Sequence, residues 1–222
     1  MVCINPQTIK IFVIHYKNLV KRKHNIIRQF KTYNITNYEF IEIDRHELTI
    51  EDMNLFEGEQ RSNKAQMAIS LSHYYAYKEI IAKYDNALIL EDDIILSNNF
   101  TNILNDYLTQ LPEDYDMLFI GDGCNLHIED HAIVPGKYIY EKDLYPTSWG
   151  GGGATRCTDS YLVSKKCAIK LCDYIKNLTS KNNRAVDWWL NEAAQNNNLK
   201  VYWAEPTIVT QGTQSGLFQS SY

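Results

Sequence analysis

Three consecutive carboxylates, Glu91-Asp92-Asp93, stand inside the most apolar run of the chain. Ala87-Leu88-Ile89-Leu90 precedes them and Ile94-Ile95-Leu96 follows, which is typical of a strand buried on both faces. Like charges held together near a protein interior repel each other with little screening. A divalent cation such as Mg²⁺ or Mn²⁺ would relieve this repulsion, because these ions prefer oxygen ligands and leave positions open for phosphates. The alternative is an exposed acidic turn, but the flanking apolar residues argue against it.

The elements that must position these acids alternate between strand and helix. The predicted strands are Ile9–Ile14, Tyr38–Ile43, the run at 87–96, Asp116–Ile120, Tyr138–Tyr140, Thr158–Val163 and Lys200–Ala204. The predicted helices are Leu19–Tyr33 after an Asn18 cap, Lys64–Tyr84, Phe100–Leu111, Lys165–Leu178 and Asp187–Asn196. Strand, helix and strand in close succession indicate parallel pairing. We therefore expect one α/β domain over residues 1–222, with ligands bound at the carboxyl ends of the strands.

Three stretches show no clear periodicity and are predicted to lack regular structure. Residues 47–62 are polar and contain Gly58. Gly150–Gly153 form a glycine run without the Lys-Ser/Thr ending of a phosphate-binding loop. The tail from Pro206 to Tyr222 is rich in Gln, Ser, Thr and Gly. We expect part of this tail, with Gln211, to close over a bound ligand.

The composition is that of an ordinary globular protein. Its 222 residues are 45% hydrophobic and 22% charged, and a net charge of −5 gives no reason to expect a nucleic-acid partner. The five cysteines form no Cys-x-x-Cys pair, so a reduced, intracellular environment is expected. No apolar run is long enough to span a membrane, and the N-terminus lacks the features of a signal peptide. We therefore expect a cytoplasmic protein, with peripheral membrane association left open.

Several short motifs follow one another in a fixed order. Ser70-Leu71-Ser72-His73 on a helix precedes the strand that ends in the three acids. Further matching pieces are Arg22 beyond the first strand, Asp44 after the second, Thr158-x-x-Tyr161-x-x-Ser164, Val186–Leu190, and Pro206–Gln211 followed by Ser215. As an ordered set, they resemble glycosyltransferase family 25, which includes bacterial lipooligosaccharide galactosyl- and glucosyltransferases and collagen galactosyltransferase domains. Residues 121–157 match least.

This resemblance implies a GT-A-type nucleotide-binding fold with a mixed, mainly parallel central sheet flanked by helices. Residues 1–120 would form the half that binds the nucleotide donor, and residues 121–222 the acceptor half and the tail. A UDP-sugar would be the donor, a Mn²⁺ or Mg²⁺ ion would bind its diphosphate, and transfer would invert the anomeric centre. A hexose, galactose or glucose, would pass to a hydroxyl of a glycan or another hydroxylated acceptor, as in polysaccharide biosynthesis.

The resemblance also implies roles for individual residues. By the family's acid-x-acid pattern, Asp93 would ligate the metal and Glu91 would contact the ribose or the donor sugar as the second acid of the metal site. Asp92 is also placed with the nucleotide, although it points to the other face of an extended strand unless the chain turns there. The other residues expected near the nucleotide are His73, Arg22, Asp44 and Gln211.

Each of these residues has a simpler alternative role. Glu91 would be a carboxylate paired with a Lys or Arg at the edge of the core, and His73 a satisfied core histidine. Arg22 would belong to a solvated basic turn with its lysine neighbours, and Asp44 would terminate its strand.

An inverting transfer needs a carboxylate on the acceptor side of the sugar, and Asp187 is our candidate for this general base. It opens a predicted helix, where an aspartate is also a favoured N-cap. The neighbouring Trp188 and Trp189 could supply an apolar wall and a stacking surface for a sugar. Asp122 and Asp159 are the reserve candidates.

Two other classes of function stay open. A sugar nucleotidyltransferase would use a similar sheet and acid cluster, but it should carry a Gly-rich triphosphate loop after the first strand, where Ile14–Asn18 has no glycine. A non-catalytic carbohydrate-binding relative is the third option, against which the intact acids argue. The sequence does not identify the donor sugar, the acceptor or the oligomeric state.

Overall fold

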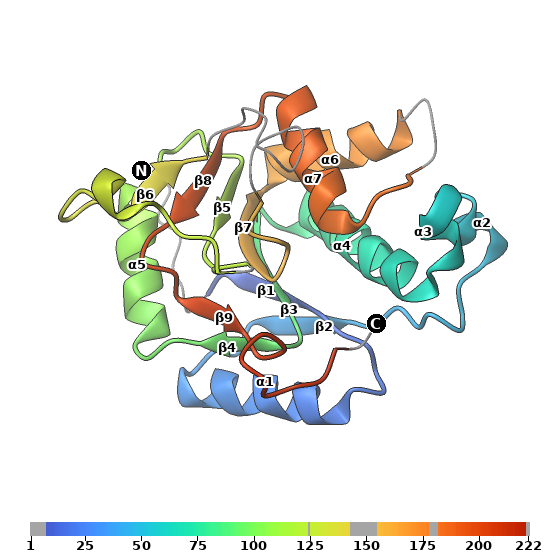
Figure 1. The fold of residues 1–222 in the computed structure, drawn as a ribbon, viewed down its shortest axis with the longest axis horizontal. Coiled ribbons are helices and arrows are strands. Elements are labelled where there is room, and N and C mark those ends of the chain that lie inside the picture. Colours follow the sequence, from blue (N-terminus) through green and yellow to red (C-terminus); the bar gives the residue numbers. More distant parts are fainter. Residues whose placement is uncertain (1–7, 124, 143–154, 178–181, 221–222) are drawn as a thin grey trace.

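The computed structural model describes residues 8–123, 125–142, 155–177 and 182–220 (Figure 1). The predicted glycine loop at 150–153 lies outside these residues. Helices cover both faces of one central sheet, so the predicted α/β architecture is confirmed. Within the described part of the chain, no helix combines the length and the apolar character needed to cross a bilayer.

The central sheet has seven strands in the order β2-β1-β3-β7-β5-β8-β6. Their bounds are β1 Lys10–Ile14, β2 Tyr38–Ile41, β3 Asn86–Glu91, β5 Met117–Phe119, β6 Ile139–Glu141, β7 Ser160–Ser164 and β8 Val201–Ala204. The pairings make β2, β1, β3, β5 and β8 run in one direction, and β7 and β6 in the other. The sheet is therefore mixed and mainly parallel in strand direction, as predicted.

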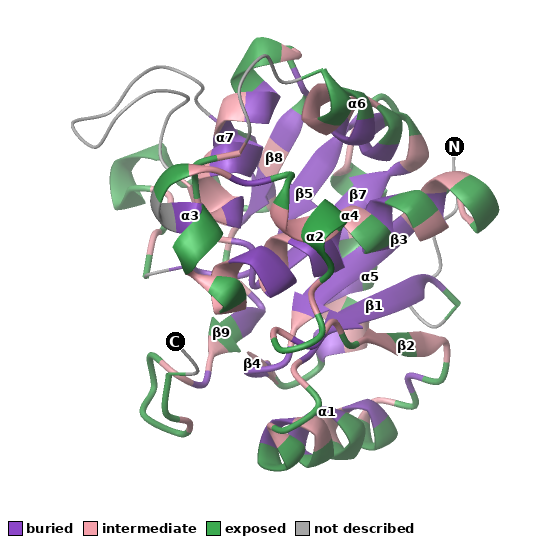
Figure 2. Ribbon diagram, turned by 90° about the vertical axis from the view of Figure 1, so that its right-hand side faces the viewer, coloured by how far each residue is buried: buried purple, intermediate pink, exposed green. Residues whose placement is uncertain are grey.

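Alternation along the strands divides the hydrophobic core into two layers. On β1, Phe12 and Ile14 belong to one cluster, whereas Ile11 and Val13 belong to the other, because successive side chains point to opposite faces of a sheet. The first cluster packs against α4 (Lys64–Lys83), α6 (Lys165–Lys176) and α7 (Val186–Asn196), and the second against α1 (Val20–Thr32) and α5 (Phe100–Gln110). Figure 2 shows the buried strands between helices whose outer faces are exposed.

The apolar run that contains the three acids is not one strand. β3 ends at Glu91, the chain turns at Asp92 and Asp93, and β4 (Ile94–Leu96) leaves the central sheet. There β4 pairs antiparallel with β9 (Val209–Gln211). β9 lies in the C-terminal tail, which was predicted to lack regular structure. The other edge of β4 is satisfied by Gln29 on α1, whose side-chain amide bonds to Ile94 O and Leu96 N at 3.0 and 2.6 Å. The acids therefore lie in the turn between two sheets.

Two further predictions of local structure were wrong. Residues 47–62 contain two short helices, α2 (Ile50–Met53) and α3 (Gly58–Ser62). Thr49 and Asp52 form a capping box at the start of α2, a signal that the polar character of the stretch obscured. Asn18 does not cap α1, since its amide donates to the Tyr16 hydroxyl at 2.7 Å. The remaining helical turn, η1 (Asp130–Ala132), lies in a stretch otherwise without regular structure.

The carboxyl ends of β1 and β3 lie side by side at the point where the strand order of the sheet reverses. From β1 the chain passes through α1 to β2 on one side, and it then returns through α4 to β3 on the other side of β1. Ligands in open α/β sheets bind at such a switch point. Because β7 runs antiparallel to β3, its first residues lie at the same edge. Residues 15–16, 91–93 and 157–159 therefore surround one point.

Candidate active site

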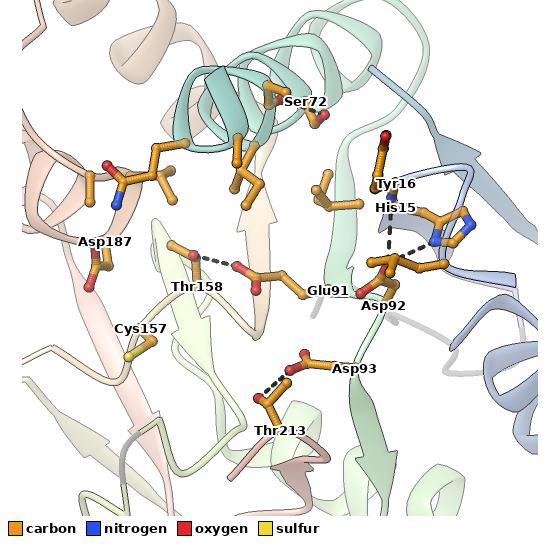
Figure 3. A pocket seen from close by; sticks show the side chains of 18 of the residues that line it. His15, Tyr16, Ser72, Glu91, Asp92, Asp93, Cys157, Thr158, Asp187 and Thr213 are labelled. Carbon is orange, nitrogen blue, oxygen red and sulfur yellow. Dashed lines mark hydrogen bonds and ion pairs between the residues drawn. The ribbon is translucent and has the colours of Figure 1, made fainter. Parts of the chain in front are cut away.

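A cavity of about 370 Å³ opens at this edge of the sheet. Its volume falls in the range of about 300 to 1,000 Å³ that is usual for small-molecule sites. Figure 3 shows His15 and Tyr16 at one end of the cavity, Asp187 at the other, and Glu91 and Asp93 between them. The lining residues come from β1, α4, the turn after β3, the segment before β7, α7 and the C-terminal tail.

Asp92 anchors the turn that follows β1, and it also lines the cavity. Its Oδ2 accepts from the backbone N–H of Tyr16 at 3.4 Å and lies 2.7 Å from His15 Nδ1. Its Oδ1 accepts from Arg22 Nη1 at 2.8 Å. Asp92 and Arg22 are 5% and 6% exposed, so this is a buried ion pair that spans β3 and α1. Asp92 therefore holds the segment after β1 with both of its carboxylate oxygens, and its predicted contact with a nucleotide stays a prediction.

Glu91 and Asp93 point into the cavity instead (Figure 3). Glu91 Oε1 accepts from the Thr158 hydroxyl at 2.7 Å, and Asp93 Oδ2 accepts from the Thr213 hydroxyl at 2.6 Å. Burial, and then the charge of Glu91, raise the pKa of Asp93, while the Thr213 hydroxyl opposes the rise. Asp93 Oδ1 is buried and has no hydrogen-bond partner.

The donor set at this point fits a divalent cation that is shared with a phosphate ligand. Within the described residues, no group of three His, Cys, Asp or Glu side chains could hold a metal ion by itself. Mg²⁺ and similar ions are commonly held by only one or two carboxylates, with substrate phosphates and water completing the shell. Asp93 Oδ1 offers an unused buried oxygen beside the carboxylate of Glu91. These two acids are the residues that would hold such an ion.

His73 lies behind Glu91 and does not line the cavity. The side chain is fully buried, and its Nδ1 hydrogen-bonds to the Tyr161 hydroxyl at 2.7 Å. That hydroxyl is in turn 2.7 Å from the Tyr77 hydroxyl. His73 Nε2 is 3.6 Å from Glu91 Oε1. His73 therefore lies on the protein side of Glu91, where its Nε2 is buried without a hydrogen-bond partner, while Glu91 faces the cavity.

Arg22 and Gln211 both line the cavity and both connect it to the C-terminal tail. Arg22 Nη2 donates to the backbone oxygen of Gln219 at 2.7 Å, and the guanidinium lies 5.6 Å from the ring centre of Phe218. Gln211 ends β9, and its Oε1 accepts from the Gln214 amide at 2.7 Å. Together with the Thr213 hydroxyl on Asp93, these contacts hold the tail against the cavity.

Asp44 stands just outside the cavity, and its neighbour Arg45 lines it. The ammonium of Lys17, 2.8 Å away, and the backbone N–H of His46 hold the pKa of Asp44 below its usual range. The Arg45 guanidinium lies 4.2 Å from the centre of the Tyr16 ring. Asp44 was predicted to lie near the nucleotide. In the structure it is its neighbour Arg45, over the Tyr16 ring, that lines the cavity.

Asp187 lines the opposite end of the cavity, in the first turn of α7. The N-cap of this helix is Ala185 and not Asp187, but the Asp187 carboxylate still accepts from first-turn backbone N–H groups. Burial and, to a lesser extent, the charge of Glu91 raise the pKa of Asp187, whereas the backbone N–H groups of Asp187 and Trp188 lower it. Trp188 lines the cavity beside it, but Trp189 is buried in the core on the far side of the helix.

The two reserve acids lie deeper than Asp187. Asp159 is fully buried next to Glu91, whose backbone N–H donates to Asp159 O at 2.8 Å. Burial raises the pKa of Asp159 well above its usual range. A Cβ on Gly121 would stand 2.1 Å from Asp159 Oδ2, so only glycine leaves room for this carboxylate. Asp122 is also buried, and neither acid is among the residues that line the cavity.

Thr158 and Thr213, which hold the two central acids, were not predicted as site residues. Thr158 had a signal in the sequence, since it opens the Thr-x-x-Tyr-x-x-Ser motif immediately before β7. Thr213 had none, because its position depends on the pairing of β9 with β4 across the fold.

Comparison with known proteins shows that residues 8–189 match the family model described as glycosyltransferase family 25 (LPS biosynthesis protein). A protein of Acanthamoeba polyphaga mimivirus whose name describes it as a glycosyltransferase is 30% identical over 144 residues. That match covers 62% of this chain and 43% of the viral protein, so the chain matches less than half the length of this relative.

Solved structures with a related arrangement of elements share little sequence with the chain. A glycosyltransferase involved in glycosylation of the major capsid of PBCV-1 aligns with a TM-score of 0.47 and 8% identity, covering 91% of this chain and 93% of that one. A Drosophila β1,4-galactosyltransferase 7 mutant in complex with manganese, UDP-Gal and xylobiose aligns with a TM-score of 0.44 and 11% identity, covering 91% and 67%.

Proposed function

Because the chain belongs to glycosyltransferase family 25, we propose that it transfers a hexose from a UDP-sugar to a hydroxyl of a glycan or another hydroxylated acceptor. The proposal includes a divalent cation and inversion at the anomeric carbon. The observation that carries it is the cavity itself. Glu91 and Asp93, with one unused buried oxygen, lie between an end that contains Arg22 and Arg45 and an end that contains Asp187.

This distribution of charge orients the two substrates. The end next to β1 and β2 offers Arg22, Arg45 and the Tyr16 ring, which suit a negatively charged nucleotide and its flat base. The two central acids would hold the cation that neutralises the diphosphate, and the donor sugar would then extend toward α7. The acceptor would enter beside Asp187.

In the reaction, the acceptor oxygen forms a bond to the anomeric carbon of the donor while the bond from that carbon to the phosphate oxygen breaks. UDP leaves with the bonding electron pair, and Asp187 takes the proton of the acceptor hydroxyl as general base. Thr158 fixes Glu91, and Thr213 fixes Asp93, through their hydroxyl hydrogen bonds. The chemistry that a bound Mg²⁺ or Mn²⁺ ion supplies is neutralisation of the charge that develops on the leaving diphosphate. The buried ion pair of Asp92 with Arg22 keeps the turn in place.

Release of nucleoside diphosphate tests this proposal. The panel comprises UDP-galactose, UDP-glucose and their N-acetylated relatives, with GDP-mannose and ADP-glucose as non-uridine controls, in Mn²⁺, in Mg²⁺ and in EDTA. We expect release of UDP from at least one UDP-hexose in the presence of metal, and little release in EDTA. Release that is equally fast in EDTA would exclude metal dependence. Turnover of only the GDP- or ADP-sugars would exclude a uridine donor.

The tail should become more protected when donor nucleotide binds. Thr213 contacts Asp93, and Gln219 contacts Arg22, so a ligand between these side chains would add contacts to a segment that is otherwise mostly exposed. We expect slower hydrogen exchange over residues 212–220 with UDP and Mn²⁺, and unchanged exchange in α5, which packs on the other layer of the core. Unchanged or faster exchange in the tail would count against closure over the donor.

A further inference from the structure

The two adjacent tryptophans of α7 have different environments. Trp189 is 5% exposed and packs in the core with the aromatic ring of Tyr174, at a centroid distance of 6.1 Å. Trp188 is half-buried and lines the cavity next to Asp187. The large apolar ring of Trp188 therefore remains accessible on one side, beside the residue that the proposed reaction uses as its base. Trp189, and not Trp188, is the tryptophan of α7 that belongs to the core cluster.

The described lining residues at this end of the cavity carry no positive charge. They are Cys157, Thr158, Ala185, Val186, Asp187 and Trp188. The cationic lining side chains Arg22 and Arg45 are at the other end, where Arg22 is paired with Asp92 and Arg45 stacks on Tyr16. A phosphate or carboxylate group placed beside Asp187 would meet a like charge, which is unfavourable in a partly desolvated site.

An aromatic face next to carboxylate oxygens is complementary to a neutral sugar ring. The C–H face of a pyranose is apolar and can cover the indole ring, while the hydroxyls at its rim donate hydrogen bonds to acceptors such as carboxylates. A peptide acceptor with one hydroxyl would leave the indole ring uncovered and would use only the carboxylate.

We propose that Trp188 is the platform for a neutral pyranose acceptor, which stacks on the indole ring and directs one hydroxyl to Asp187. The inference rests on the proposed transferase function, because it names the acceptor for that same site. The acceptor is a saccharide without phosphate or carboxylate on the ring that contacts Trp188.

Saturation-transfer NMR can test this binding without turnover. The probes are methyl β-D-galactopyranoside, methyl β-D-glucopyranoside and the anionic methyl β-D-glucuronide, each with UDP and Mg²⁺. We expect saturation of the ring C–H groups of the neutral glycosides and at least about tenfold weaker binding to Trp188→Ala. Trp188→Phe, which keeps an aromatic face, should stay within about threefold of the wild type. Tyr75→Ala is the matched control, because Tyr75 is an exposed aromatic on α4 outside the cavity.

The possible results separate this inference from the proposed function. Neutral glycosides that bind through Trp188, in a protein that turns over no UDP-sugar, would support the platform and overturn the transferase. Normal donor turnover with unchanged glycoside binding in Trp188→Ala would overturn the platform and leave the transferase. Glucuronide binding as tight as that of the neutral glycosides would overturn the assignment of a neutral acceptor.

Discussion

Replacing Asp187 with asparagine is expected to lower sugar transfer by roughly 10²-fold or more, the usual scale for loss of a general base. Asparagine has nearly the same shape but cannot accept the proton of the acceptor hydroxyl. Folding should be little affected, since the asparagine side-chain oxygen can still accept from the first-turn backbone N–H groups of α7. Binding of UDP should also persist, because Asp187 lies at the opposite end of the cavity from Arg22 and Tyr16. Initial rates of UDP release with acceptor, together with calorimetric titration of UDP, measure the two effects.

The pH dependence provides a second measurement of the same role. Burial raises the pKa of Asp187, and a general base must be deprotonated to act. The wild-type rate should therefore rise with pH around an apparent pKa above that of an ordinary aspartate. This rise should be absent from the residual activity of Asp187→Asn. Glu192→Gln is the matched control, since Glu192 is on the same helix but pairs with Arg184 at the surface. Transfer by Asp187→Asn within a few-fold of the wild type would move the search to Asp122 and Asp159.

Asp93→Ala should abolish the additional thermal stabilisation that UDP gives in the presence of Mn²⁺. Asp93 supplies an unused buried oxygen at the centre of the cavity, and a bound ligand stabilises a protein by a free energy that grows with the logarithm of ligand concentration over Kd. Without ligands, the variant should be at least as stable as the wild type near neutral pH, because removal of Asp93 also removes a carboxylate whose pKa is raised by burial. Differential scanning fluorimetry with UDP, with Mn²⁺ and with both gives the comparison.

The neighbouring acid is the informative control for Asp93. Asp92→Ala should destabilise the unliganded protein by about 3 kcal/mol, because it leaves the buried guanidinium of Arg22 without its partner. Asp106 is an exposed carboxylate on α5. Asp106→Asn should change neither the stability of the protein without ligands nor its stabilisation by UDP and Mn²⁺. A full UDP and Mn²⁺ shift in Asp93→Ala would place the metal elsewhere.

Elements with strong periodicity were predictable from the sequence to within a few residues. The helices α4, α5 and α6 and the strands β1, β3 and β7 lie where their apolar patterns placed them. The βαβ start of the chain and the antiparallel β7 then bring the acids to one edge of the sheet. This is why a continuous apolar strand that ends in acids was sufficient to locate the cavity.

The outer two acids were predicted to face the ligand and Asp92 the other side of the strand, but the partners of each acid were not predictable from the local pattern. Apolar residues on both sides of the acid triplet read as one strand, whereas the chain turns at Asp92 and Asp93 and gives each carboxylate a different environment. That turn depends on pairing of β4 with β9 and on the Arg22 side chain, both of which come from distant parts of the sequence. The position of the His73 side chain was not predictable for a related reason. Its helix face was identified correctly as apolar, and the partner that orients the ring, Tyr161, comes from another element.

The turn at Asp92 and Asp93 also bears on the order in which the protein folds. Thr213 and Asp93 are 120 residues apart in the sequence, and Arg22 and Gln219 are 197 apart. Contacts of such high sequence separation close large loops, so their entropic cost falls late in folding. The sheet and its helices can form around local βαβ units before β9 reaches β4. The centre of the cavity is therefore completed only when the C-terminal tail has docked, and this docking also buries Ile208 and Val209 in the core. A fluctuation that detaches β9 would remove the Thr213 contact from Asp93 and also expose Ile208 and Val209, so the ligand site is coupled to this layer of the core.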